Sequence, residues 1–164
     1  MIRKRPTRLD VYIAAIVIGG AAVLVSSAVA LPSTPHAREW SILAGLALVA
    51  SRLTLRMPGR NARFSISDTF FIASAILFGS GPATLAIAVD SALMTRGFKI
   101  FSLRRLLFNT GAVPLALWGG FQVFRLLAGT EPLFGRGIAI DALVIPVAAF
   151  ALMYYVLNAG LISV

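Results

Sequence analysis

The sequence predicts an all-α protein, a polytopic transmembrane bundle of six helices with a short hairpin between the third and fourth. Three observations support this fold class. Hydrophobic residues fill 59% of the 164 positions, charged residues fill 13%, and the mean hydropathy is +0.89. The apolar residues form runs, and basic residues cluster between the runs. Soluble domains carry about 25% charged residues, and a chain of this length cannot hide so much apolar surface in a soluble core.

Punctuating residues set the ends of the predicted helices. Pro32 and Pro35 end the first run, and Trp40 opens the second as an interfacial anchor. A break from Gly79 to Pro82 separates two short runs, and proline suits the first turn of a helix. The chain is expected to form one transmembrane domain. The predicted helices cover about residues 11–31, 40–55, 64–78, 82–95, 106–127 and 138–164.

Two of these helices carry features that bear on the fold. Ser65 or Ser67 is expected to cap the third helix, and Asp68 suits the positive end of its dipole. The fourth helix is about 21 Å long at ~1.5 Å per residue, which is shorter than a ~30 Å hydrocarbon core. We therefore expect it to be tilted or shielded by its neighbours.

A small-residue face is predicted on the first helix. Ala22, Ser26 and Ala30 recur every four residues, and small residues at this spacing let another helix approach closely. This pattern predicts that these three residues pack inside the bundle.

Basic residues are concentrated on the side of the N-terminus if six helices alternate across the membrane. Cytoplasmic segments are enriched in Lys and Arg, so both termini are predicted to be cytoplasmic in a bacterial inner membrane. Reading residues 64–95 as a single span would move one cluster outside, so the charge pattern favours the hairpin. The three inner clusters are Arg3, Lys4, Arg5 and Arg8; Arg52, Arg56, Arg60 and Arg63; and Arg96, Lys99, Arg104 and Arg105, and the outer residues are Arg38, Arg125 and Arg136.

The residues favour neither an enzyme nor a metal protein. Cysteine is absent and His36 is the single histidine, whereas metal sites need several ligands. The turn at Gly79 to Gly81 lacks the lysine of a phosphate-binding loop. The basic residues lie between apolar runs, which argues against a nucleic-acid partner. We therefore predict no catalytic residues, no metal and no cofactor, with the lipid bilayer and other membrane subunits or a cytoplasmic signalling domain as partners.

Ionisable residues within a bilayer are costly and are candidate functional groups. Asp90 is the strongest candidate, and we expect either an ion pair with Arg104 or Arg105 or a hydrogen bond to Asn109. A ligand-binding role for Asp90 is the alternative. A second ion pair is predicted between two residues near the outer face. The candidate polar cluster comprises Asp90, Asn109, Gln122 and Asn158, and the second ion pair comprises Arg125 and Asp141.

Several short motifs resemble known membrane proteins. The patterns are Ser65 to Asp68, Leu77 to Ala83 with the later Asp90, Arg105 to Gly111 (RLLFNTG), and Tyr155 to Leu161 (YVLNAGL). Over residues 40–164 the chain resembles the N-terminal multi-helix sensor (MASE-like) region of bacterial signalling proteins that end in GGDEF or HD-GYP domains. The first two patterns are also similar to the substrate-binding S component of energy-coupling-factor vitamin transporters.

Three functions follow from these observations. The resemblance to signalling proteins implies a sensory or anchoring module whose downstream enzyme makes or degrades cyclic di-GMP. The S-component resemblance implies a subunit that binds a small vitamin-like substrate. The third candidate function is that of an accessory structural subunit of a larger membrane complex. The apolar run ending at Val164 without a charged flank predicts that the chain is the N-terminal part of a longer protein.

Overall fold

The computed structural model describes residues 7–52, 54–56, 63–96, 102–129, 133–135, 137 and 139–162. The prediction of a helical fold with six α-helices is confirmed over these residues. A one-turn 3₁₀ helix, η1, and a two-stranded hairpin accompany them. The elements are α1 (Arg8–Ala30), η1 (Leu31–Ser33), α2 (Ala37–Ala50), β1 (Thr54–Arg56), β2 (Arg63–Ser65), α3 (Ser67–Phe78), α4 (Ser80–Arg96), α5 (Leu103–Ala128) and α6 (Ile140–Ile162).

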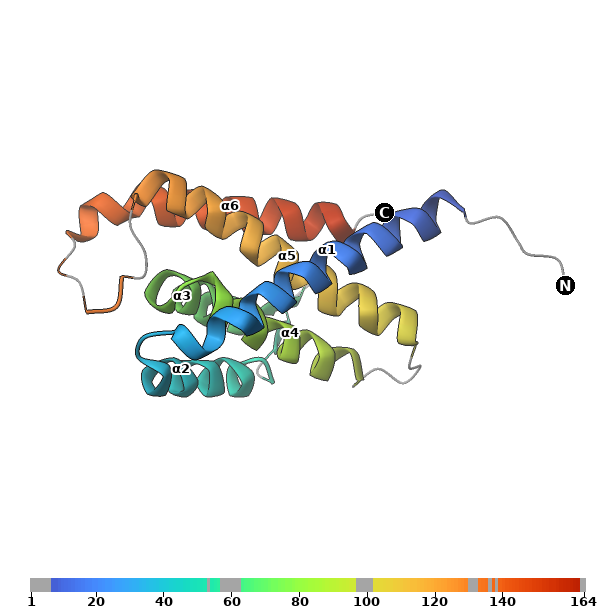
Figure 1. Cartoon of the computed structure of the whole chain (residues 1–164), viewed down its shortest axis with the longest axis horizontal. Coiled ribbons are helices and arrows are strands. Elements are labelled where there is room, and N and C mark those ends of the chain that lie inside the picture. The colour runs from blue at the N-terminus through green and yellow to red at the C-terminus, as the bar shows by residue number, and fades with distance from the viewer. Residues whose placement is uncertain are drawn as a thin grey trace, which may run out of the picture.

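Helix α5 lies at the centre of the bundle and packs against α1, α4 and α6. Figure 1 shows α1 crossing α5, with α6 lying along the opposite side of α5. The shorter helices α2 and α3 lie side by side in one half of the molecule. The beginnings of α1 and α5 and the ends of α4 and α6 extend toward the other half (Figure 1).

The crossing of α1 and α5 depends on two glycines. A Cβ at Gly20 would overlap the Cα of Gly111 and lie 2.6 Å from its carbonyl oxygen. The two backbones therefore touch at this point, as small residues allow in helix packing. The prediction that Ala22, Ser26 and Ala30 form the packed face of α1 is wrong, because these residues are exposed. The buried face of α1 comprises Ile16, Gly20, Val23 and Ser27.

Helices α5 and α6 pack through a glycine pair and an aromatic cluster. A Cβ at Gly120 would lie 2.9 Å from Cδ2 of Phe150, so the ring of Phe150 sits directly on the α5 backbone. Phe121 stacks on Phe124 with ring centroids 5.7 Å apart and meets Phe150 edge-on at 5.9 Å. All three rings are almost fully buried, and they fill the half of the bundle that also holds α2 and α3.

The segment between α2 and α3 differs from the prediction. Helix α2 ends at Ala50, and β1 pairs antiparallel with β2 where the sequence predicted helix, in the register Thr54 to Ser65 and Arg56 to Arg63. Helix α3 begins at Ser67 with Ile66 as N-cap and no side-chain capping bond, so the predicted serine cap is wrong. Apolar residues on both sides of the arginine-rich loop allow hairpin pairing as readily as helix extension.

The break between α3 and α4 is one residue long. Gly79 has φ of +94°, a conformation that glycine adopts without a Cβ penalty. Helix α4 begins at Ser80, so Pro82 occupies its first turn, where a missing N–H is tolerated. The predicted position of the break is confirmed.

Within the described residues, three helical stretches are long and apolar enough to cross a membrane by length and composition: Arg8–Ser33, Leu103–Ala128 and Ile140–Leu161. Helices α2, α3 and α4 have 14, 12 and 17 residues, or about 21, 18 and 26 Å at ~1.5 Å per residue. All three are shorter than a ~30 Å hydrocarbon core. The fold is compatible with membrane insertion, while six spans and cytoplasmic termini remain predictions.

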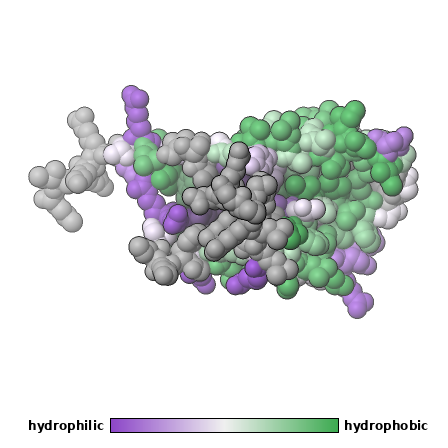
Figure 2. Space-filling model, turned by 180° about the vertical axis from the view of Figure 1, so that it is seen from behind, coloured by the Kyte–Doolittle hydropathy of each residue, from purple (hydrophilic) through white to green (hydrophobic). Residues whose placement is uncertain are grey.

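The outer surface suits lipid. Large apolar side chains such as Ile18, Val29 and Ile145 are 70%, 78% and 73% exposed. Figure 2 shows hydrophobic side chains over much of the coloured surface, with hydrophilic ones chiefly toward the ends and the lower edge. Without a bilayer this exposure would mark an aggregation hazard or a docking surface.

The described basic residues are unequally divided between the two ends. Arg96, Arg104 and Arg105 lie at the end where the chain begins, together with Arg8, and Arg38 and Arg125 lie at the other end. Arg52, Arg56 and Arg63, which were also predicted on the inner side, follow α2 or lie in β1 and β2, so the charge pattern as a whole stays a prediction. Arg3, Lys4, Arg5, Arg60, Lys99, Arg136 and Val164 lie outside the described residues.

We predict that Gly20→Ala lowers the free energy of unfolding by about 1–3 kcal/mol, because the new methyl group overpacks the α1–α5 crossing. Thermal unfolding in detergent or nanodiscs measures the change. Gly45→Ala is the matched control, since a Cβ at this position of α2 meets nothing within 4 Å. Equal stability of the two variants would contradict the backbone contact.

Candidate functional site

A polar pocket of about 280 Å³ lies among α3, α4, α5 and α6. It is the candidate functional site, and it brings together three of the four residues of the predicted polar cluster. Its lining residues are Asp68, Asp90, Ser91, Met94, Thr95, Asn109, Val113, Tyr154 and Asn158.

The pocket forms where α3 stops covering its neighbours. Helix α3 begins only at Ser67, so it lies against one half of α4 and α5. Toward the other half, the end of α4 and the beginning of α5 carry short polar side chains, among them Ser91, Thr95 and Asn109. These side chains do not fill space as the phenylalanine rings do in the half occupied by α3, and the volume among the helices remains.

The hydroxyl groups of α4 are occupied within their own helix. Ser91 Oγ donates to the carbonyl of Ile87 at 2.8 Å, and Thr95 Oγ1 donates to the carbonyl of Ser91 at 2.7 Å. Asn109 Nδ2 donates to Thr95 Oγ1 at 3.1 Å and so joins α5 to α4. The donors on this wall of the pocket are thereby used in holding the wall together.

Asp90 is 9% exposed, and its Oδ1 has no hydrogen-bond partner among the described residues. The Ser51 hydroxyl at the end of α2 interacts with the Asp90 carboxylate, and the exposed Arg52 acts on it electrostatically. Ser51 also donates to the carbonyl of Leu48 at 2.8 Å, so its single proton has two competing acceptors. Asp90 is therefore a buried acceptor with unused capacity, an arrangement that usually has a functional reason.

The predicted partners of Asp90 are corrected by the structure. Arg104 Nη2 lies 2.7 Å from Oδ1 of Asp10 and forms its ion pair there. Arg105 lines a separate groove with residues of α1 and makes no ion pair with Asp90 among the described side chains. The Asn109 amide donates to Thr95 rather than to Asp90.

Helix α6 contributes Tyr154 and Asn158 to the opposite wall. Tyr154 is 2% exposed, and its hydroxyl donates to Oδ1 of Asp68 at 3.3 Å, which ties α6 to the start of α3. Asn158 Oδ1 is buried without a hydrogen-bond partner among the described residues. Two residues of the lining, Asp90 on α4 and Asn158 on α6, therefore each carry a buried acceptor oxygen that no described donor satisfies.

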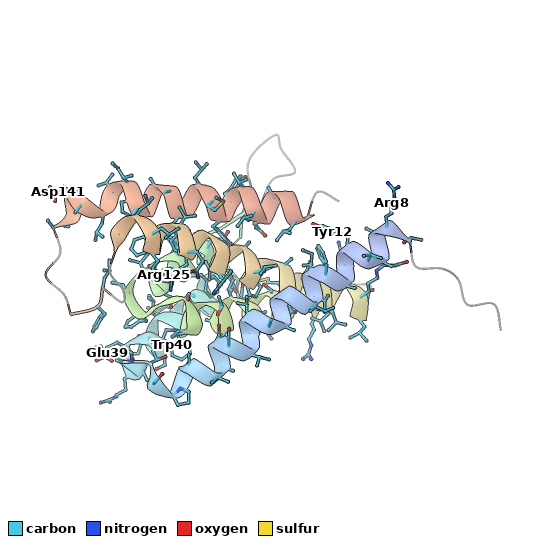
Figure 3. The ribbon with its side chains drawn as sticks, turned by 45° about the horizontal axis from the view of Figure 1, so that its top comes forward. Arg8, Tyr12, Glu39, Trp40, Arg125 and Asp141 are labelled. Carbon is cyan, nitrogen blue, oxygen red and sulfur yellow. The ribbon has the colours of Figure 1, made fainter. Side chains whose placement is uncertain are left out.

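The remaining candidate residues lie elsewhere. Gln122 is on α5 but does not line the pocket. Asp141 is exposed at the beginning of α6, and Arg125 lies near the end of α5. Figure 3 shows Asp141 at the tip of α6, apart from Arg125, so this predicted ion pair is wrong.

Sequence reasoning missed two residues of the pocket, Asp68 and Tyr154, and the partner of Arg104, Asp10. Asp68 was interpreted only as a helix-dipole residue and Tyr154 only as one of a tyrosine pair. Asp10 was overlooked, although Thr7 and Asp10 have the spacing of a capping box and form one in the structure. That motif would have placed the start of α1 at Arg8 and the Asp10 carboxylate beside the beginning of the chain.

Among the described residues, no three acidic, histidine or cysteine side chains come together as metal ligands. Comparison with known proteins finds no matching family model, no matching curated protein and no matching solved structure. The functional argument therefore rests on the pocket and on the residues that line it.

We predict that Tyr154→Phe lowers the free energy of unfolding by about 0.5–1.5 kcal/mol, the usual net value of one hydrogen bond, because the link between Asp68 and α6 is lost. Chemical or thermal unfolding in nanodiscs measures this change in the free energy of unfolding. Tyr155→Phe is the control, since this neighbouring side chain is 62% exposed. If both variants unfold alike, the hydrogen bond does not contribute to stability.

Proposed function

We propose that this chain is the ligand-sensing membrane region of a bacterial signalling protein. In this proposal it is a non-catalytic multi-pass module of the inner membrane with both termini in the cytoplasm. One observation carries the proposal. The polar residues Asp68, Asp90, Asn109 and Asn158, which belong to the motifs that resemble those of sensor regions, come from four different helices and line one pocket.

The pocket is well placed to influence the end of α6. Tyr154 and Asn158 belong to its last turns, since the helix ends at Ile162. The hydroxyl of Tyr12 on α1 donates to the carbonyl of Leu161 at 3.0 Å and holds this end against α1. A ligand that binds Tyr154 or Asn158 would compete with the contacts that position α6. An output domain or partner in the cytoplasm would then respond to the new position.

A substrate-binding transport subunit is the second candidate. The same pocket supports it, because a solute carrier of this kind also needs a polar cavity inside an apolar bundle. The pocket volume of about 280 Å³ is close to the lower limit for small-molecule sites, about 300 Å³. An accessory structural subunit is less favoured, because structural packing would not require buried acceptors without donors.

Asp90→Asn separates the sensory function from a structural one. Because asparagine keeps the size of the side chain and an acceptor oxygen for the Ser51 hydroxyl, we expect the substitution to change the unfolding temperature little while it alters the output of the native protein. The first measurement is the intact mass of the native protein from its own membrane. A mass well above 17.4 kDa would give the output domain to assay, with cyclic di-GMP turnover as the readout.

Two results would contradict the proposal. A native mass near 17.4 kDa with no signalling protein co-purifying would favour the transport or structural function. A loss of stability in Asp90→Asn with unchanged output per folded molecule would make Asp90 a structural anchor. Ser26→Ala is the control, because Ser26 is on α1 and its hydroxyl bonds only to the carbonyl of Val23 within the same helix.

A further inference from the structure

We propose that the polar pocket binds a small organic cation, such as a protonated primary amine with a short alkyl chain. This inference rests on the proposed function, since it names the chemical class of ligand for the same pocket. Three features of the lining carry it: its charge, its excess of hydrogen-bond acceptors and its apolar wall.

The charge of the lining is negative. Asp68 and Asp90 line the pocket, and no Lys, Arg or His is among its described lining residues. Arg52 interacts with Asp90 from outside the pocket and is exposed. Arg104, the nearest predicted neutralising group, is paired with Asp10. A cationic ligand would complement these two carboxylates, of which Asp68 accepts a hydrogen bond from Tyr154 and Asp90 interacts with Arg52.

The hydrogen-bond inventory points in the same direction. Ser91 donates to Ile87 and one N–H of Asn109 donates to Thr95, whereas the second N–H of Asn109 and the amide of Asn158 have no recorded acceptor. Asp90 Oδ1 and Asn158 Oδ1 are acceptors without a donor among the described residues. Donors on a ligand would satisfy these acceptors, and an ammonium group brings three donors and no acceptor.

The apolar part of the lining limits the size and polarity of the ligand beyond its charged group. Met94 and Val113 contribute apolar surface to a volume of about 280 Å³. A short alkyl chain fits this surface, and methionine adapts to ligands of varied shape. The described residues offer no group of three acidic, histidine or cysteine ligands, which favours an organic cation over a bare metal ion.

Binding of n-butylammonium chloride to the full chain in nanodiscs tests the proposal. Isothermal titration calorimetry should give saturable binding to the wild type, and Asp90→Asn should weaken the binding at least tenfold. Asp10→Asn is the matched control, because it removes the same charge outside the pocket and should leave the affinity unchanged. Sodium butyrate and n-butanol, with similar alkyl chains but no positive charge, should bind at least tenfold more weakly.

Each other result overturns the inference. Absence of butylammonium binding, or equal affinity of wild type and Asp90→Asn, would remove the cation site. Equal or tighter binding of butanol or butyrate that depends on Asp90 would show that the pocket takes a ligand of another class. In that case the cation assignment fails and the proposed sensory function stands, since the mass and output measurements do not depend on this probe.

Discussion

The contact between Gly20 and Gly111 is the constraint on which the rest of the bundle depends. Because the backbones of α1 and α5 touch there, α5 sits at the centre, with α1 on one side and α6 on the other. In a bilayer the lipid is as apolar as the helix surface, so close packing rather than hydrophobic burial must hold helices together. The glycine contact provides that packing for α5, the central helix that also forms one wall of the pocket.

The two halves of the bundle illustrate a division between stability and function. Around Phe121, Phe124 and Phe150 the helices pack through large rings with almost no exposure. Around Asp90 and Asn158 they leave a pocket and two acceptor oxygens without donors. Filling the second half with apolar side chains would remove buried polar groups at little cost. This polarity is the basis of the proposed ligand site.

Sequence periodicity predicted the helices and the break at Gly79, because apolar runs and a glycine with positive φ leave local signals. It also predicted the cluster of Asp90, Asn109 and Asn158, because polar groups in an apolar bundle gather away from lipid. It did not predict which face of α1 is buried, since lipid-facing and protein-facing residues are equally apolar. The ion pair of Arg104 with Asp10 was missed because it joins residues far apart in the chain, and no local pattern specifies that choice.

The central claim is that a polar cavity, and not a filled core, occupies the bundle where α4, α5 and α6 meet. The absence of cysteine allows a direct measurement of labelling by a small water-soluble methanethiosulfonate at single introduced cysteines. Ser91 lines the pocket, whereas the equally buried Ser27 is bonded to Thr84 at 2.7 Å between α1 and α4. The account predicts rapid labelling of Ser91→Cys and slow labelling of Ser27→Cys. Equally slow labelling at both positions would contradict it.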